Sequence, residues 1–314
     1  MKTIFINELG SGVSLQAEHF VLTDFKEAVT KKGDTYYRLK LADKTGSISG
    51  IVWNNHVPDV DRGALEVGTV IALDATVESF QENLQLNIQR IAKAKDYDNA
   101  DFIQKTRKDV KKLWKFLVAE IDSVENKEIK ILLKSIIENK EYSKKLKTLP
   151  GGITIHHAFI GGLLEHLCEM FSLAASLYEY YPEADPDIVR AGILLHDIGK
   201  LYEIEEKGTV YDYTLEGNLI GHMTLGVEFL LNHLPKDFPE DIKTKIIHII
   251  MSHNGEVEKG SPIPPKTIEA AIVAGVDRVS SNVRQFQKHI QNNEGSDREF
   301  SHYDKYLNAG VYLK

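Results

Sequence analysis

Apolar and polar residues alternate through most of residues 13–94, a pattern typical of β-strands. These stretches are rich in β-branched and aromatic residues, and clusters of Gly, Asp and Asn separate them. The pattern predicts strands at residues 13–28, 35–43, 47–53, 69–80 and 84–94, with a longer connection or short helix at residues 57–68. A small closed barrel is the expected fold, and an OB-fold is the most economical choice.

The spacing of apolar residues changes to three and four from about residue 96, which indicates helices. Pro150 and the pair Gly151/Gly152 end the first helical run. Further helical stretches are predicted at residues 161–181, 186–204, 220–234, 240–254 and 265–290, and the polar tail after about residue 291 is expected to pack loosely. The chain is therefore predicted to contain an all-β barrel (1–95), a basic helical connector (96–150) and an all-α helical domain (151–314).

The chain has 314 residues, enough for two domains with a core each, and its 42% hydrophobic content is typical of a globular protein. Its first residues, MKTIFINELGSG, lack the apolar core of a signal peptide, and no apolar run approaches the roughly 18 residues that span a bilayer. Cys168 is the single cysteine, so it has no internal disulfide partner and is expected to pack as a small buried residue. These features predict a cytoplasmic protein without membrane attachment.

The net charge of −8 is unevenly distributed along the chain. Residues 105–150 contain 13 basic and 7 acidic residues, whereas residues 151–314 contain 14 basic and 24 acidic residues. The surplus of carboxylates in the last half suits a cation-binding domain, while the basic middle segment could attract a polyanion.

Six polar residues interrupt apolar helical stretches or stand at their ends: His166, His196, Asp197, His222, His253 and Asp277. Burial of such groups without a partner costs several kcal/mol, and metal coordination is one way to offset that cost. Imidazole and carboxylate together suit Mn²⁺, Fe²⁺, Zn²⁺ or Co²⁺, and the lack of thiolates argues against a closed structural zinc site. At a helix end, adjacent His196 and Asp197 can both reach one ion, or Asp197 can bridge two. Gly199 is consistent with such an irregularity.

The pattern H…HD…D, formed by His166, His196 with Asp197, and Asp277, resembles the HD phosphohydrolase superfamily. The resemblance implies metal-dependent hydrolysis of phosphate esters. Two additional histidines occur in members that hold two metals, and His222 and His253 stand at the corresponding places. The implied cofactor is one or two divalent ions, with Mn²⁺ as the first choice and Co²⁺, Fe²⁺ or Zn²⁺ as alternatives.

The segments HHAFIGGLLEH, LLHDIGK and GSPIPPKTIEA, preceded by LADKTGSISGIVW in the barrel, closely resemble the YhaM family of 3′-5′ exoribonucleases. Nearly the whole chain is covered. The resemblance implies an OB-fold joined to an HD domain that removes nucleotides from the 3′ end of single-stranded RNA, with single-stranded DNA as a further candidate. One departure is Asn254, where a second histidine after His253 is expected, which puts any role of position 254 as a ligand in doubt.

Further residues are expected to contact the substrate. His196, Asp197 and Lys200 are the candidate catalytic residues, and Lys200 is close enough to the HD pair to contact a phosphate. His156 and His157 are candidate phosphate contacts that could equally pack. OB-folds bind strands through aromatic stacking and basic groups, and the candidates in the barrel are Tyr37, Arg38, Trp53, Phe80 and Arg90. Because Tyr36 and Tyr37 are adjacent in a strand, one of the two is expected to pack inside.

Two other functions are compatible with the sequence. An HD site also supports a nucleotide or cyclic-nucleotide phosphohydrolase, in which the barrel would serve another purpose. A non-catalytic strand-binding adaptor is disfavoured by the complete set of six candidate ligands. The sequence does not determine the assembly state, and a homo-oligomer is compatible with it.

Overall fold

The computed structural model describes residues 2–80, 83–153, 157–293 and 298–314. Within these ranges, no helix is both long and apolar enough to cross a membrane. The chain forms two compact units: residues 1–104 together with 206–212, and residues 105–205 together with 213–314. This division differs from the predicted segments 1–95, 96–150 and 151–314, because the helices of the predicted connector pack within the second unit.

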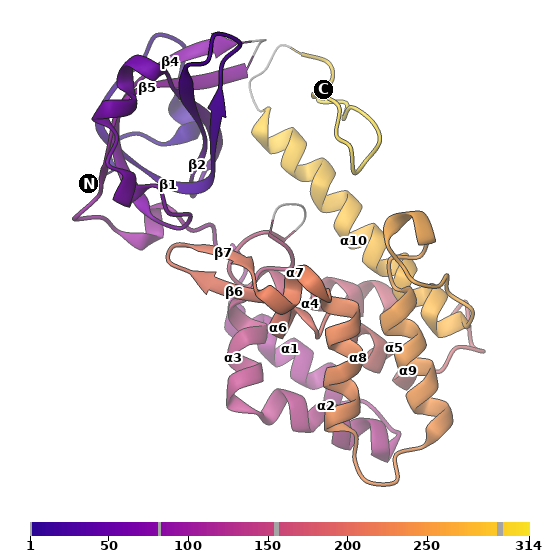
Figure 1. The fold of residues 1–314 in the computed structure, drawn as a ribbon. Helices are drawn as coiled ribbons and strands as arrows, with labels where there is room; N and C mark the ends of the chain where they lie inside the picture. The colour runs from indigo at the N-terminus through magenta and orange to yellow at the C-terminus, as the bar shows by residue number, and fades with distance from the viewer. Residues whose placement is uncertain (1, 81–82, 154–156, 294–297) are drawn as a thin grey trace. The chain divides into compact units, whose positions relative to one another are not determined.

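The first unit contains a closed β-barrel, drawn in indigo and purple in Figure 1. Its strands are β1 (Ser14–Val29), β2 (Thr35–Asp43), β3 (Gly46–Val52), β4 (Val70–Phe80) and β5 (Asn83–Lys93). They follow the order β1-β2-β3-β5-β4, with β3 and β5 parallel and the other neighbours antiparallel. The predicted OB-fold-like barrel at the N-terminus is confirmed.

Alternation along each strand separates the barrel core from its outer face. On β2, Tyr37, Leu39 and Leu41 are buried inside, whereas Arg38 and Lys40 point outward. Short 3₁₀ helices at Asn54–Asp59 and Arg62–Ala64 fill the predicted longer connection between β3 and β4. Further 3₁₀ turns lie at Ile6–Glu8 and Asn99–Asp101.

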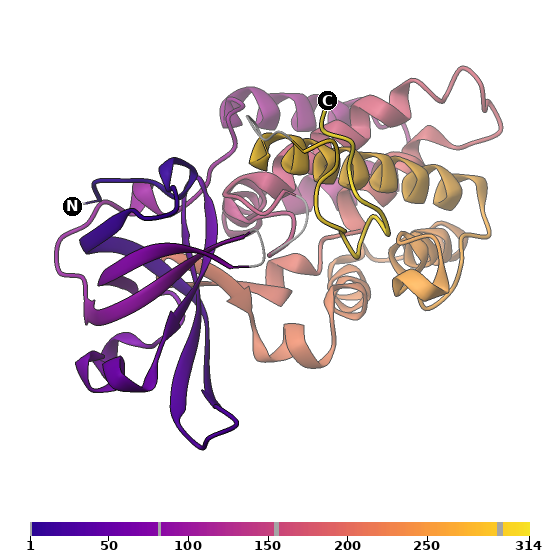
Figure 2. The ribbon, with the colours of Figure 1, turned by 90° about the horizontal axis from the view of Figure 1, so that it is seen from above.

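The second unit is mainly helical, as predicted, and Figures 1 and 2 show its helices from magenta to gold. The helices are α1 (Val110–Asp122), α2 (Lys127–Glu138), α3 (Lys140–Thr148), α4 (Gly162–Ala175), α5 (Pro186–Leu195), α6 (Lys200–Glu203), α7 (Leu215–Leu219), α8 (His222–His233), α9 (Glu240–Ser252) and α10 (Ile268–Asn292), with a 3₁₀ turn at Val257–Lys259. Asp109, Asn126, Asn139 and Asp185 cap α1, α2, α3 and α5 by accepting backbone N–H groups.

Helices α4 and α5 are central to this unit. α4 packs against α1, α3 and α10, and α5 packs against α2, α9 and α10. α4 is buried along much of its length, from Gly162 to Cys168, and α5 from Asp187 to Val189 and from Ala191 to Leu195. Polar residues on these two helices therefore lie in the interior, where the candidate site is found.

Several segments differ from the prediction, among them residues 204–213 and the C-terminal tail. Residues predicted as helical near position 204 instead begin a two-stranded sheet of β6 (Ile204–Lys207) and β7 (Val210–Tyr213), joined at Gly208 with a positive φ of 63°. The tail folds back onto α10, since Asp304 accepts hydrogen bonds from Gln285 at 2.8 Å and from His289 at 2.7 Å. The tail was expected to pack loosely because it is polar, but the carboxylate of Asp304 attaches it to α10.

Candidate metal centre

The HD pair lies where α5 ends. α5 stops at Leu195, His196 is its C-cap, and Asp197 lies in the turn before α6. Gly199 is required in this turn because a Cβ atom there would lie 1.9 Å from the carbonyl oxygen of His222. This close approach brings the start of α8, and with it the side chain of His222, next to the HD pair.

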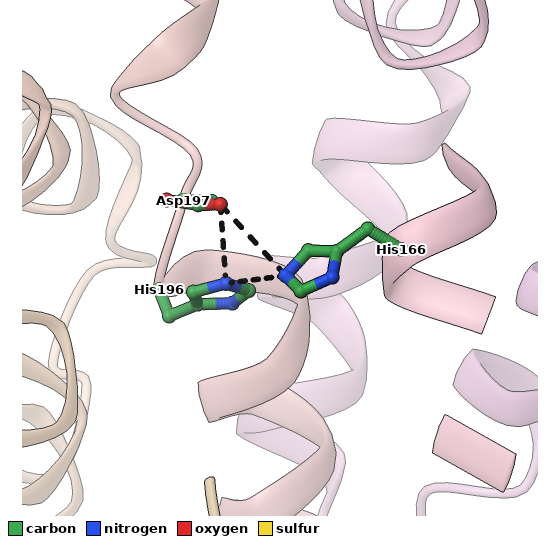
Figure 3. Close-up of side chains that lie close together, drawn as sticks. All are labelled: His166, His196 and Asp197. Carbon is green, nitrogen blue, oxygen red and sulfur yellow. Dashed lines mark hydrogen bonds and ion pairs between the residues drawn. The ribbon is translucent and has the colours of Figure 1, made fainter. Parts of the chain in front are cut away.

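Four imidazoles surround the carboxylate of Asp197. Oδ2 lies 3.2 Å from Nε2 of His196 and 4.0 Å from Nε2 of His166. Oδ1 lies 3.6 Å from Nε2 of His222 and 3.8 Å from Nε2 of His253. Figure 3 shows His166 from α4 and His196 from the end of α5 pointing toward Asp197. Residues from α4, the α5–α6 turn, α8 and the end of α9 thus converge on one carboxylate.

Asp277 joins this cluster from α10. Its Oδ1 lies 3.3 Å from Nε2 of His166, and that nitrogen is also 3.4 Å from Nε2 of His196. The structure therefore brings all six predicted ligand residues together. Among the described residues, two groups have donor atoms that lie within 4.8 Å of one another, namely His166, His196 and Asp197, and Asp197, His222 and His253. Asp197 belongs to both groups.

The Nδ1 atoms of three of these histidines have hydrogen-bond partners of their own. His196 and His253 each donate from Nδ1 to the carbonyl oxygen three residues earlier, at 2.8 Å. Nδ1 of His222 lies 3.1 Å from Oε1 of Glu203. Carbonyl and carboxylate oxygens only accept hydrogen bonds, so each Nδ1 carries a proton and Nε2 is the atom left to bind a cation. These Nε2 atoms face the carboxylate oxygens of Asp197, an arrangement that a bound cation stabilises once the nitrogens are unprotonated.

Charges within the site keep both carboxylates ionised. Burial alone would raise the pKa of Asp197, but the charges of Lys200 and His196 hold it well below its usual range. Burial likewise opposes ionisation of Asp277, but the hydrogen bond and charge of His166 lower its pKa. Burial, followed by the charge of His196, lowers the pKa of His253 to about 3, so this imidazole is neutral at neutral pH. The donor set of neutral imidazole and carboxylate fits a divalent metal ion.

Lys200 is part of the site but is not exposed to solvent. Its Nζ lies 2.6 Å from Oδ2 of Asp197 and donates to the carbonyl oxygen of Gly151. Only 8% of its surface is exposed. Lys200 therefore forms an ion pair with Asp197. The contact with a phosphate predicted for Lys200 stays a prediction.

The two other histidines predicted as phosphate contacts lie differently. His156 falls outside the described residues. His157 is buried, with Nε2 3.3 Å from Glu169 and 3.4 Å from the hydroxyl of Ser280. Burial, opposed in part by the Glu169 hydrogen bond, lowers its pKa to about 4. A neutral, buried imidazole is poorly suited to bind a phosphate, and these contacts favour the packing alternative.

On the barrel, the structure places Tyr37 inside. Its ring packs edge-on against Phe25, with centroids 5.2 Å apart, and its hydroxyl accepts a hydrogen bond from Arg62. With 1% of its surface exposed, Tyr37 has no ring face for a base, so its assignment as a strand contact is corrected. Its neighbour Tyr36 takes the outward position and stacks on Trp53, with centroids 5.6 Å apart.

The remaining barrel candidates are exposed. Arg38 lies on the same side of β2 as Tyr36, with its guanidinium 5.8 Å from that ring. Phe80, at the end of β4, is 59% exposed, and Arg90 is exposed on β5. Arg38 and Tyr36 on β2 and Trp53, the residue directly after β3, thus form one continuous outer surface.

Sequence reasoning missed the residues that hold the ligands in place. Glu203 and Ser280 contact His222 and His166, but neither stands in a motif. A serine inside a helix has the same appearance in the sequence whether it faces solvent or a buried histidine. Tyr36 could have been found, because alternation makes it the outward partner of whichever tyrosine packs inside.

Known proteins share the sequence features of this chain. A model of the HD domain family matches residues 163–282, the part of the chain that carries the six clustered residues. A protein of Oceanobacillus iheyensis named 3′-5′ exoribonuclease YhaM is 31% identical over 292 residues, which cover 90% of this chain and 89% of the relative. The chain belongs to the YhaM family. The resemblance stated from the sequence is therefore confirmed.

A second YhaM relative, from Listeria monocytogenes, is 28% identical over 302 residues and covers 93% of both chains. Solved structures resemble the two parts of the chain separately. The second OB-fold domain of replication protein A from Methanococcus maripaludis is 24% identical, with a TM-score of 0.23, and the match covers 31% of this chain and 99% of that domain. The HD domain of the phosphodiesterase PgpH from Listeria monocytogenes is 22% identical, with a TM-score of 0.32, and the match covers 50% of this chain and 82% of that structure.

Proposed function

We propose that this YhaM-family protein is a metal-dependent 3′-5′ exoribonuclease that hydrolyses phosphodiester bonds at the 3′ end of single-stranded RNA. The observation that carries the proposal is the carboxylate of Asp197, which faces Nε2 of four histidines, two at each oxygen. The names of the relatives supply the reaction, and this arrangement supplies the chemistry that the reaction needs.

The residues that would hold the metal form two groups that share Asp197. A divalent ion bound there supplies positive charge at the scissile phosphate and activates a water molecule for attack. Mn²⁺ is our first choice, because a site of imidazole and carboxylate with no thiolate suits it, and Co²⁺, Fe²⁺ and Zn²⁺ are the alternatives. The proposed ligands are His166, His196, Asp197, His222, His253 and Asp277.

Lys200 and the fixed imidazole rings give this site its shape and charge. The buried ammonium of Lys200 partly neutralises Asp197, which limits repulsion between that carboxylate and an incoming phosphate. The imidazole rings of His196 and His253 are held by backbone carbonyls, so their Nε2 atoms keep one orientation. We propose that phosphate binding needs little rearrangement of these side chains.

The outer surface formed by Arg38, Tyr36 and Trp53 is proposed to bind the strand upstream of the cleaved bond. Exposed aromatic rings stack on bases, and each stack contributes about 1–3 kcal/mol. The guanidinium of Arg38 adds a contact for a phosphate or for a base face. The basic segment 105–150, which includes α1 to α3, adds positive charge that attracts RNA.

Cleavage of oligoribonucleotides labelled at the 5′ end tests this function. With Mn²⁺, the protein should shorten the RNA stepwise from the 3′ end, and a chelator should abolish the reaction. Asp197→Asn should lower the rate by about 100-fold or more, because both groups lose a shared ligand. Asp24→Asn, which changes an exposed carboxylate on the barrel, is the matched control and should cleave normally. Equal cleavage with chelator would refute the proposal, and hydrolysis of mononucleotides alone would favour a nucleotide phosphohydrolase.

A further inference from the structure

A small pocket of about 220 Å³ lies between the loop that follows α9 and the first half of α10. Its lining includes Asn254 and Glu256 from the loop and Ala271, Ala274, Gly275 and Arg278 from α10. Asn254 directly follows His253 in the chain. Arg278 directly follows Asp277, so both walls of this Glu256 pocket continue from residues of the metal centre.

The metal centre opens to solvent at two of its residues, and one of them adjoins this pocket. The side chains of His222 and Asp277 are 23% and 13% exposed, whereas those of the other four clustered residues are at most 4% exposed. Ala274 lies one helical turn before Asp277 and therefore on the same face of α10. A phosphate that approaches the centre along Asp277 has the Glu256 pocket beside it.

The size of the Glu256 pocket limits what it can hold. Sites for whole drug-sized ligands typically measure about 300–1,000 Å³, so a pocket of about 220 Å³ suits a single sugar ring better than a complete nucleotide. A small residue keeps this space open, since a Cβ atom on Gly275 would have no neighbour within 4 Å. The nucleobase attached to such a sugar would remain outside, so the pocket does not select one base over another.

Glu256 gives the pocket an acceptor for hydroxyl groups. Its Oε1 lies 3.2 Å from Nη1 of Arg278, and both side chains are about half exposed, so this ion pair leaves the carboxylate accessible. Carboxylates accept hydrogen bonds from ribose hydroxyls in other proteins, and the amide of Asn254 can donate to a hydroxyl oxygen. In an RNA strand, only the 3′-terminal ribose has both its 2′- and its 3′-hydroxyl free.

We propose that the Glu256 pocket binds the ribose of the 3′-terminal nucleotide, and that Glu256 accepts hydrogen bonds from both of its hydroxyls. This inference rests on the proposed function and names the end group that the site selects. Internal sugars lack a free 3′-hydroxyl, so the pocket favours cleavage at the end of the strand over cleavage within it. The 2′-hydroxyl favours RNA over DNA, and a terminal 3′-phosphate is disfavoured because its charge repels Glu256.

Oligoribonucleotides that differ only in the last sugar test this proposal. With Mn²⁺ in single-turnover reactions, a 2′-deoxy terminal residue should slow release of the first nucleotide by about 10–100-fold, because one hydrogen bond to a charged group is lost. The steps that follow should run at the normal rate. A terminal 3′-phosphate should slow the first step at least as much. Equal rates for the ribose and 2′-deoxy ends would overturn the proposal.

Variants of Glu256 assign this selectivity to one side chain. Glu256→Ala should lose the preference for ribose, and Glu256→Gln should cleave the 3′-phosphate end about tenfold faster than the wild type, because the repulsion is removed. Glu258→Gln changes an exposed carboxylate of the same loop and should keep both selectivities. Full preference for ribose in a folded Glu256→Ala would contradict the proposal. Weaker Mn²⁺ binding by Glu256→Gln in titration calorimetry would place Glu256 in the metal centre and also overturn its assignment to the sugar.

Binding in chelator provides a readout that needs no cleavage. By fluorescence anisotropy, an RNA that ends in ribose should bind about tenfold or more tightly than the same RNA ending in 2′,3′-dideoxyribose, and Glu256→Ala should bind both equally. Because the rest of the strand is identical, this ratio reports on the end group alone. If the wild type cleaved no RNA, the nuclease function would fail, whereas this ratio would still decide whether the pocket binds a terminal ribose.

Discussion

Nζ of Lys200 lies 2.6 Å from Oδ2 of Asp197, and both side chains are buried. The carboxylate that four imidazoles face is therefore also half of an ion pair. Burial disfavours the charged form of Lys200, but the charge of Asp197 outweighs it and raises the pKa of the ammonium. The pair provides the metal-free site with an internal cation and links Lys200 to metal binding.

Lys200→Met tests this link. Removing one partner of a buried ion pair leaves the other charge uncompensated, at a cost of about 3–5 kcal/mol in the metal-free protein. A bound divalent ion compensates that charge, so Mn²⁺ should raise the Tm of Lys200→Met by more than it raises that of the wild type. Thermal melts with Mn²⁺ and with chelator measure both shifts. Lys134→Met, which removes an exposed lysine paired with Asp122, should match the wild type, and equal shifts in all three proteins would argue against the link.

A second prediction concerns the close approach at Gly199. In Gly199→Ala the new methyl group would lie 1.9 Å from the carbonyl oxygen of His222 and 2.6 Å from the amide nitrogen of Gly226. Both are backbone atoms, so α8 must move away from the HD pair. We expect a loss of about 1–3 kcal/mol of stability by chemical denaturation, together with weaker Mn²⁺ binding.

Gly275→Ala is the matched control for this prediction. Gly275 lies in α10, two residues before Asp277, and a Cβ atom there has no neighbour within 4 Å. Alanine is a better helix former by about 1 kcal/mol, so Gly275→Ala should be neutral or stabilising. A Gly199→Ala protein with the same stability and metal affinity as the wild type would show that the approach of α8 is not needed.

Much of this fold could be predicted because local pattern and tertiary structure agree. β2 was predicted at its observed bounds, since each buried residue alternates with an outward one. The six clustered residues were recognisable because polar groups in apolar helices stand out. Closure of the barrel by the parallel pairing of β3 with β5 has no local signal, because it joins strands that are distant in the sequence.

Other features could not be predicted because tertiary contacts decide them. The apolar spacing of residues 186–204 continues through the HD pair and by itself indicates one helical stretch, so the expected helix end at His196 and Asp197 had support only from the nearby Gly199. The break depends on the contact between Gly199 and α8, which the spacing does not encode. The same holds for Ser280, whose role depends on α10 lying against α4.

A third prediction compares an exposed residue of the barrel, expected to contribute to RNA affinity, with a buried residue, expected to contribute to stability. Trp53→Ala removes an exposed ring that stacks on Tyr36, so RNA affinity should fall by about 1–3 kcal/mol while the barrel stays folded. Tyr37→Ala removes a buried ring and should cost about 3–5 kcal/mol of stability instead. Fluorescence anisotropy with labelled RNA in chelator measures binding without cleavage, and denaturation measures stability. Unchanged RNA affinity in Trp53→Ala would remove this surface from the proposed function.

The last prediction uses Cys168, the single cysteine of the chain. Its thiol is buried and donates to the carbonyl of Leu113 at 3.4 Å. It lies at the base of an open pocket of about 660 Å³ that Phe116 and Leu173 also line. Burial raises its pKa to about 12, whereas an exposed cysteine has a pKa of about 8.5. Because only the thiolate reacts, alkylation of the folded protein at about pH 8 should be at least roughly 1,000-fold slower than alkylation in denaturant.

Mass spectrometry of iodoacetamide-treated protein measures both rates. The rate in the folded protein should increase about tenfold for each pH unit, because the thiolate fraction increases in that proportion below the pKa. Ser123→Cys places a second thiol at an exposed C-cap and should take up one label rapidly, which shows that the reagent is active. Rapid labelling of Cys168 in the folded wild type would mean that the reagent reaches this thiol through the open pocket between α1, α4 and α10.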